Sequence, residues 1–504
     1  MSIPEPILQI IDKLTKANHE AYIVGGCVRD LVLSEVEGLR DAKPKDWDIT
    51  TSARPEQIQK LFKKSFYDNA FGTVGVITDS DDETLKVIEI TTFRTEAKYS
   101  DKRHPDKVEF AKTVEEDLMR RDFTINAIAA EIRNTKYEVR NSRPATRDPQ
   151  TSLVLIDPYN GQADLKKGII RTVGNPDERF SEDALRLMRA IRFATTLDFA
   201  IEENTLKSIQ KNAPLLQEIA KERIKDELEK ILMSKRAHFG IMYLAETGLL
   251  KYILPEFERG IGISQNHHHP FDCFYHGIAS LEFAVSENYN LELRLAALLH
   301  DIGKPYVKEN LGTRSTFYNH AQFGAKVTET ILKRLKFSNK VIEKVVHLVR
   351  FHLFYYETDI VTESGVRRLL VRIGKDNAQD FIALRMCDRF GSRVPKIKPY
   401  GLRHLEYMFE KVSSDPITPK MLKINGDDIM KLLKIEPGPR IGLILNALLE
   451  EVLDDPKKNK KTLLKKMVQD FAKLSAKALE KKANKIHEFK EEKIAKIKAK
   501  FWVK

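Results

Sequence analysis

The chain has 504 residues, of which 42% are hydrophobic and 31% are charged. It is too long for a single hydrophobic core, so we expect two to four domains. No run reaches the roughly 18 apolar residues that a membrane span requires, and the N-terminal stretch lacks the layout of a signal peptide. Cys27, Cys273 and Cys387 lie too far apart for a disulfide framework or a CxxC zinc site. These features predict a soluble, cytoplasmic protein.

The net charge of +12 comes from the C-terminal segment. Residues 457–504 hold 17 lysines and 5 acidic residues, so the first 456 residues are close to neutral. A basic tail on a neutral body suits contact with a phosphate backbone, although a solvated lysine-rich helix explains the same composition equally well. Leu464, Val468 and Phe471 recur at helical spacing, which predicts an amphipathic helix.

The predicted elements change in kind along the chain. Short β-branched runs between turn residues predict strands at residues 21–24, 73–78, 85–93, 107–110 and 153–157. Beyond Asp157, apolar residues recur at helical spacing, which predicts helices over residues 182–197, 222–234, 291–303, 324–335 and 440–453. The fold class is therefore expected to be α+β, with an α/β head followed by an all-helical remainder.

The first motif lies at the end of the first predicted strand. Gly25 and Gly26 follow this strand and precede a predicted helix. This turn is expected to present bare backbone N–H groups to an anion, because glycine allows a close approach and the N-terminus of a helix favours negative charge. Arg29, one turn further on, adds a cation for a phosphate. The pattern indicates a phosphate site, but a Gly-Gly pair before a helix is common by itself.

A pair of carboxylates follows about twenty residues later. Asp46 and Asp48 are two residues apart, and such positions in a strand point to the same face. Glu89, in the predicted strand at residues 85–93, is a candidate third carboxylate. Hard oxygen ligands of this kind suit Mg²⁺ beside a triphosphate. An isolated Asp-x-Asp pair is more often a turn or a surface strand, so its neighbours decide the interpretation.

Two basic segments supply those neighbours. The stretch EDLMRRDFTINAIA contains Arg121, Asp122 and Asn126, which suit ribose and phosphate contacts. The stretch SEDALRLMRAIRF is predicted to place Asp183 and Arg186 on one helical face, three residues apart. Arg189 and Arg192 continue this basic ridge. A surface helical salt bridge is the alternative for Asp183 and Arg186.

These motifs together resemble the bacterial-type (class II) tRNA nucleotidyltransferase and poly(A) polymerase family. The resemblance rests on GGCVRD, KDWDI, RRDFTINA, the stretch at residues 157–193 and ERIKDELEKIL, in this order over roughly residues 20–235. It implies a polymerase-beta-like head in which Gly25, Gly26 and Arg29 hold the triphosphate and Asp46 and Asp48 hold Mg²⁺. The implied reaction is nucleotidyl transfer to an RNA 3′-hydroxyl.

The resemblance also implies how the base is chosen. In this family, the residues that match Asp183 and Arg186 act as an amino-acid template. Cytosine and adenine each present an amino donor beside a ring-nitrogen acceptor, which a carboxylate and a guanidinium complement. Uracil and guanine present the reverse pattern and would leave buried groups unpaired.

Two segments bear on the subfamily. Residues 91–110 resemble the flexible loop that full CCA-adding enzymes use when they switch from C to A, which argues against an enzyme that adds only C. The linker at residues 34–45 is longer than the short turn usual in the family. This departure leaves the local geometry before Asp46 open.

The helical remainder carries a second constellation. His300-Asp301-Ile302-Gly303 resembles the HD superfamily of metal-dependent phosphohydrolases. That resemblance implies a divalent metal, of unknown identity, held by His276, His300, Asp301 and Asp388. Such a metal suits the activation of water. Three further histidines are expected beside the ligands or near a substrate phosphate: His320, His347 and His352. A merely structural His-Asp pair is the alternative.

These observations define the predicted organisation and function. We expect a head at residues 1–160, a base-selecting neck at 161–236, an HD module at 237–400, a tRNA-contacting region at 401–455 and a lysine-rich tail at 456–504. The predicted function is template-independent CCA addition to tRNA with CTP, ATP and Mg²⁺. The alternatives are a poly(A) polymerase, an A-adding enzyme, or an HD phosphohydrolase with a nucleotide-binding head.

Overall fold

The structure is a computed structural model. It describes residues 3–35, 44, 46–68, 72–97, 107–134, 151–265, 271–311, 314–354, 356–358, 360–393 and 398–483. The chain forms two compact units, one from Met1–Arg259 with Ile331–Phe337 and one from Gly260–Thr330 with Ser338–Lys504. Within the described ranges, no helix combines the length and apolarity that crossing a membrane requires.

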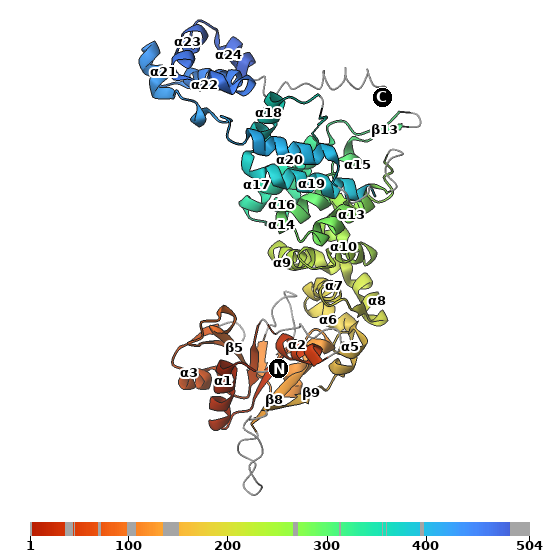
Figure 1. Cartoon of the computed structure of the whole chain (residues 1–504). Helices are drawn as coiled ribbons and strands as arrows, with labels where there is room; N and C mark the ends of the chain where they lie inside the picture. Colours follow the sequence, from red (N-terminus) through yellow and green to blue (C-terminus); the bar gives the residue numbers. More distant parts are fainter. Residues whose placement is uncertain are drawn as a thin grey trace. The chain divides into compact units, whose positions relative to one another are not determined.

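The first unit contains a seven-stranded sheet with the order β3-β4-β5-β2-β1-β8-β9 (Figure 1). Its strands are β1 (Ala21–Val24), β2 (Asp48–Thr51), β3 (Ser65–Asp68), β4 (Thr73–Ile77), β5 (Val87–Thr92), β8 (Ala129–Asn134) and β9 (Thr151–Ile156). Only β2 and β5 pair in parallel; every other neighbouring pair in this sheet is antiparallel. A separate antiparallel hairpin joins β6 (Arg94–Ala97) to β7 (Lys107–Phe110). The predicted strands are confirmed, and β3, β6 and β8 were not predicted.

Helices surround this sheet and continue beyond it. They are α1 (Glu5–Lys16), α2 (Gly26–Glu35), α3 (Pro55–Leu61), α4 (Val114–Met119), α5 (Gly161–Lys167), α6 (Pro176–Glu182), α7 (Leu185–Leu197), α8 (Glu203–Asn212), α9 (Lys221–Leu232), α10 (Ala237–Glu246), α11 (Leu250–Ile253) and α12 (Pro255–Glu258). A short parallel pair, β10 (Ile169–Ile170) and β11 (Ala200–Ile201), lies among them. Val24, Phe93 and Leu118 pack in one buried cluster, which fixes α4 on the sheet near the end of β1.

The second unit is almost entirely helical. Its helices are α13 (Cys273–Ser286), α14 (Leu291–Leu299), α15 (Lys304–Val307), α16 (His320–Arg334), α17 (Asn339–Phe351), α18 (Glu363–Ile373), α19 (Ala378–Gly391), α20 (Tyr400–Val412), α21 (Gly426–Leu433), α22 (Pro439–Asp454), α23 (Lys461–Phe471) and α24 (Ala476–Ala483). The end of α16 groups with the first unit. A small hairpin pairs β12 (Glu309–Leu311) with β13 (Arg314–Thr316). The α+β fold class predicted from the sequence is confirmed.

Two parts of this unit matter for the predictions. Helix α13 packs against both α14 and α19, so residues far apart in sequence meet at one place. In α23, Leu464, Val468 and Phe471 are buried, which confirms the amphipathic helix predicted at the start of the tail. The rest of the lysine-rich tail, residues 484–504, lies outside the described residues, as do most of the linker at 34–45 and the middle of the loop at 91–110.

Candidate functional site

The turn after β1 requires glycine at its first position. Gly25 has a φ of +79°, a conformation that residues with a side chain rarely adopt. A Cβ at Gly25 would lie 2.9 Å from Nη1 of Arg121 and 3.7 Å from Oδ2 of Asp48. The N–H of Gly25 donates to the carbonyl of Ile128 at 3.2 Å, so this donor is not available to an anion, contrary to the sequence-based expectation of bare N–H groups.

The predicted carboxylates lie beside this turn. Asp48 is the first residue of β2, opposite Val24 on β1 and beside Glu89 on the parallel strand β5. Asp46 precedes the strand and is exposed, so the expectation that both aspartates lie within a strand is wrong for Asp46. Burial raises the pKa of Asp48, the positive charge of Arg121 opposes that rise, and the charge of Asp46 adds to it. The fold therefore concentrates negative charge at this edge.

A buried acid on α4 orients the two arginines of the RRD motif. Asp117 is 0% exposed, and its Oδ1 accepts from Nε of Arg120 at 3.0 Å. Its Oδ2 lies 3.5 Å from Nη2 of Arg121. Sequence reasoning missed Asp117, although it stands three residues before Arg120 in a segment already recognised as part of a motif. Its position aims Arg121 toward Gly25 and Asp48.

A second network links the RRD motif to the neck. The carboxylate of Asp122 accepts from Nε of Arg189 at 2.7 Å and from Nδ2 of Asn126 at 3.2 Å. Oδ1 of Asn126 accepts from Arg29 at 2.9 Å. Burial raises the pKa of Asp122, but the charge of Arg189 and the hydrogen bonds outweigh it and lower the pKa to about 2. Four residues predicted to bind nucleotide thus contact one another.

The segment predicted to select the base has a different local structure from the one expected. The helix expected over residues 182–197 is interrupted, because Asp183 is extended with φ −142° and ψ 104° between α6 and α7. Asp183 therefore does not share a helical face with Arg186, and its Oδ1 instead accepts from the N–H of Leu185 at 3.0 Å. The side chain of Asp183 pairs with Arg223 on α9, while Arg186 pairs with Glu182.

The hairpin of β6 and β7 accounts for the ends of the predicted flexible loop. Both strands are described, while residues 98–106 between them lie outside the described part of the chain.

Arg192, the last residue of the predicted basic ridge, pairs with buried Glu227 on α9 at 2.7 Å. Its guanidinium carbon also lies 3.8 Å from the ring centroid of Phe193.

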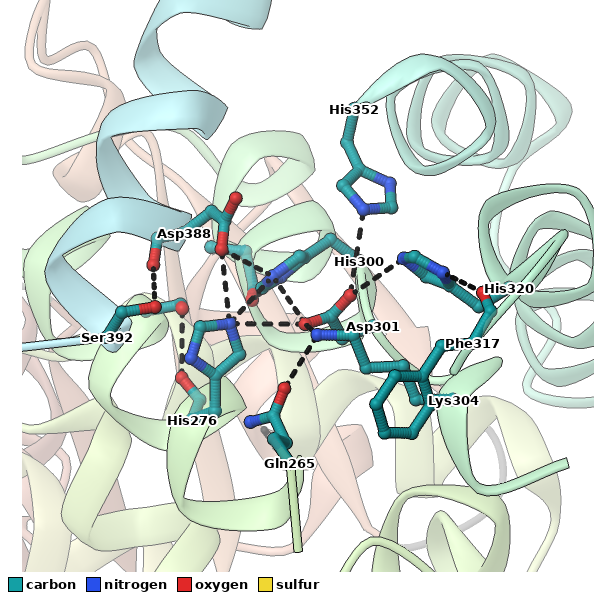
Figure 2. A network of polar contacts seen from close by, with 12 residues as sticks. Gln265, His276, His300, Asp301, Lys304, Phe317, His320, His352, Asp388 and Ser392 are labelled. Atoms are coloured by element: carbon teal, nitrogen blue, oxygen red, sulfur yellow. Dashed lines mark hydrogen bonds and ion pairs between the residues drawn. The ribbon is translucent and has the colours of Figure 1, made fainter. Parts of the chain in front are cut away.

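The four predicted ligands of the HD site converge in the second unit (Figure 2). Nε2 of His276 lies 3.1 Å from Nε2 of His300, 3.2 Å from Oδ2 of Asp301 and 3.3 Å from Oδ1 of Asp388. Nε2 of His300 lies 3.3 Å from Oδ2 of Asp301. The packing of α13 against α14 and α19 brings these residues together.

Two of the three additional histidines belong to the same centre. His320 and His352 point their Nε2 atoms at Oδ1 of Asp301, at 3.3 Å and 3.6 Å. Both Nε2 atoms are buried and lack a hydrogen-bond partner. His347 does not join them, because its Nε2 lies 2.7 Å from the carbonyl oxygen of Ile373.

The tautomers of these histidines follow from their other ring nitrogen. Nδ1 of His300, His320 and His352 lies 2.9, 2.7 and 2.7 Å from a backbone carbonyl oxygen. A carbonyl only accepts hydrogen bonds, so Nδ1 carries the proton in each ring. In the neutral ring, Nε2 then carries a lone pair that faces a carboxylate, which also only accepts. Either a metal ion or a second ring proton between these groups satisfies both. Burial lowers the pKa of His300, but the carboxylates of Asp301 and Asp388 raise it to about 10.

A lysine that sequence reasoning missed completes the centre. Nζ of Lys304 lies 2.6 Å from Oδ2 of Asp301 and donates to Oε1 of Gln265 at 2.6 Å. Burial raises the pKa of Asp301, yet the charges of Lys304 and His300 and the histidine hydrogen bonds hold it well below its usual range. A cavity of about 630 Å³ opens beside the centre, and Arg385, Arg389 and Tyr356 contribute to its lining.

Family comparisons match three parts of the chain. Residues 21–171 match the "Poly A polymerase head domain", and residues 198–261 match the "Probable RNA and SrmB- binding site of polymerase A". Residues 316–468 match a tRNA nucleotidyltransferase domain 2. The first match contains the Gly25 turn and the Asp46 and Asp48 carboxylates described above.

Similar proteins cover most of the chain. A CCA-adding enzyme of Ligilactobacillus salivarius is 34% identical over 88% of this chain and 91% of its own length. An A-adding tRNA nucleotidyltransferase of Deinococcus radiodurans is 34% identical over 68% of this chain and 76% of its own length. The crystal structure of the Bacillus stearothermophilus CCA-adding enzyme in complex with CTP aligns with a TM-score of 0.63 and 28% identity, over 94% of this chain and 98% of that one.

Proposed function

Because the chain belongs to the family of bacterial tRNA nucleotidyltransferases, we propose that it adds CCA to the 3′ end of tRNA from CTP and ATP. The observation that carries this proposal is the likeness to a CCA-adding enzyme over about nine-tenths of both chains. The arrangement of Gly25, Arg121 and the two aspartates at the end of β1 supports it.

In the proposed reaction, Asp46 and Asp48 would hold Mg²⁺. The donor set fits, because two hard carboxylates lie close enough for the charge of Asp46 to raise the pKa of Asp48. When bound, Mg²⁺ would supply a Lewis acid for the attacking hydroxyl and the leaving pyrophosphate. Glu89, on the strand next to Asp48, would add negative charge to this edge.

The cations around the Gly25 turn would hold the triphosphate. Arg121 is directed at this turn by buried Asp117, and Arg29 reaches the same region from the first turn of α2 through Asn126. Charge-assisted hydrogen bonds of this kind neutralise phosphate oxygens and orient the reacting phosphorus. Gly25 leaves the space that these groups need.

Base choice would use Asp183 and Arg186. Asp183 accepts from the amino group of cytosine or adenine, and Arg186 donates to the neighbouring ring nitrogen. Uracil places an acceptor opposite Asp183 and a donor opposite Arg186, so both side chains would lose their hydrogen-bond partners. The same two side chains would therefore accept two of the four bases.

Incorporation on defined transcripts tests this proposal. A tRNA transcript that lacks its terminal CCA is incubated with Mg²⁺ and labelled CTP, ATP, UTP or GTP, singly and combined. Two C residues followed by one A, and then a stop, is the expected product. Incorporation of A only onto a transcript ending in CC would mark an A-adding enzyme, as the Deinococcus relative is named. A long run of A would mark a poly(A) polymerase.

A second function is favoured by the centre in the second unit. We propose that His276, His300, Asp301 and Asp388 hold a divalent metal for hydrolysis of a phosphoester. The facing lone pairs of His300, His320 and His352 with the carboxylate of Asp301 support a cation at this place. Asp301, His320 and His352 form a second group, so the centre has donors for two ions.

Metal content and hydrolysis test this second function separately. The full chain is dialysed against Mn²⁺, Ni²⁺ or Zn²⁺ and its bound metal is measured. We expect one to two ions per chain to remain in an Asp46→Ala, Asp48→Ala double variant, which lacks the proposed metal ligands of the head. The variant His300→Gln with Asp388→Asn should lose these ions and any hydrolysis of a phosphate ester while nucleotide incorporation continues. Metal content that is unchanged in this variant would contradict the assignment.

A further inference from the structure

The motif ERIKDELEKIL contributes a residue to the predicted template that its pattern alone does not reveal. It forms α9, which packs against α7. Arg223 on α9 forms a two-pronged contact with Asp183, from Nη2 to Oδ2 at 2.7 Å and from Nη1 to Oδ1 at 3.2 Å. A guanidinium fork of this kind fixes the plane of a carboxylate as well as its position.

The contacts of Asp183 leave one acceptor position open. Its Oδ1 accepts from Arg223 and from the N–H of Leu185, and its Oδ2 accepts from Arg223. A carboxylate has about four acceptor positions, so the three described contacts leave about one, on Oδ2. The side chain of Asp183 is 14% exposed, so the carboxylate is not sealed from solvent.

Helix α9 holds the other end of the basic ridge as well. Glu227 lies one turn after Arg223 on α9 and pairs with Arg192 at 2.7 Å. Glu227 is 3% exposed, and its side chain is therefore held by packing. Arg223 and Glu227, which lie one turn apart on α9 and carry opposite charges, therefore fix this helix against both ends of the segment from Asp183 to Arg192. The carboxylate of Asp183 is thereby attached to a rigid element.

We propose that Arg223 is a positioning residue that determines base specificity by directing the single open acceptor of Asp183 at the base. This inference rests on the proposed function, because it concerns the choice among nucleotides. With its plane fixed, Asp183 reaches the exocyclic amino group of cytosine or adenine. Without Arg223, the carboxylate can rotate to accept from the neighbouring ring N–H of uracil, which fixed geometry excludes.

The test compares nucleotide discrimination in Arg223→Lys with that of the full wild-type chain. Lysine keeps the positive charge but cannot form the fork. Values of kcat/KM for CTP and for UTP are measured on a transcript that lacks CCA. The matched control is Lys225→Ala, which removes a cation of the same helix that pairs with Asp226. We expect the CTP-to-UTP ratio to fall about tenfold or more in Arg223→Lys and to stay at the wild-type value in the control.

The outcomes separate this inference from the proposed function. Equal losses for CTP and UTP, with an unchanged ratio, would overturn it and leave Arg223 with a structural role only. A wild-type chain that incorporates neither CTP nor ATP would overturn the proposed function itself. The double variant Asp183→Asn, Arg223→Lys adds a second readout. If Arg223 acts through Asp183, Arg223→Lys should change the ratio little once Asp183 is Asn, whereas independent, additive effects would overturn the inference.

Discussion

The ion pair between buried Asp122 and half-buried Arg189 should contribute measurably to the stability of the first unit. The pKa of Asp122 falls from 3.8 to about 2 in the folded chain. A difference of nearly two pKa units corresponds to about 2.5 kcal/mol of stabilisation. Arg189 also loses its counter-charge, but its side chain is 33% exposed and keeps contact with water, so the cost of a fully buried unpaired charge does not apply. We therefore expect Asp122→Asn to lose about 2.5 kcal/mol at pH 7.

The pH dependence of this loss follows from the direction of the shift. A folded-state pKa below the unfolded value gives stability that is present above the unfolded pKa and lost as the pH falls toward the folded one. The gap between wild type and Asp122→Asn should therefore be constant above about pH 5 and narrow below about pH 4.

Urea unfolding followed by tryptophan fluorescence measures this gap. Trp47 is 6% exposed and lies in the head, so it reports on the first unit. A Trp502→Phe background leaves Trp47 as the only tryptophan of the 2 in the sequence. Asp226→Asn, which removes an exposed carboxylate on α9, is the control and should change stability little. An unchanged urea midpoint for Asp122→Asn at pH 7, or a gap that does not narrow at pH 3, would refute the reasoning.

Three further outcomes are expected. Gly25→Ala should lower the free energy of unfolding by about 1–2 kcal/mol because of its left-handed backbone, and a clash with Arg121 should lower it further and slow incorporation. The control Gly174→Ala, at φ +69° with nothing within 4 Å of its Cβ, should lose only the backbone contribution. Equal losses in the two variants would contradict the clash. Asp48→Asn should lower incorporation at least about a hundredfold while thermal stability at pH 7 holds or rises, because burial disfavours the Asp48 charge; a lower melting temperature would contradict this. Chelation of divalent metal should lower the melting temperature of the second unit, and His300→Gln should remove this response.

The strands and the glycine turn of the head could be predicted from the sequence because they depend on local residue preferences. Strands at residues 21–24, 73–78 and 85–93 followed from β-branched runs, and all three are present. The turn at Gly25 followed from its place between a strand and a helix, and the structure adds that Arg121 lies too close for a Cβ at this position. The chain order of these motifs was sufficient to identify the family.

The pairing of charges could not be predicted, because it depends on how distant elements pack. Asp122 and Arg189 are 67 residues apart, and Asp183 and Arg223 are 40 apart. Sequence spacing had placed Asp183 on a helix with Arg186, but Asp183 is extended between α6 and α7, and its Oδ1 accepts from the N–H of Leu185.

The sequence by itself determined which residue types can carry the chemistry of both units, because motifs such as Gly25-Gly26 and His300-Asp301 depend on side-chain chemistry and short spacing. Only the tertiary structure decided which partner each side chain has. The packing of α13 against α14 and α19 turns His276 toward His300, and the packing of α9 against α7 gives Asp183 its arginine. Such contacts form between surfaces far apart in the chain, where no local pattern specifies the register.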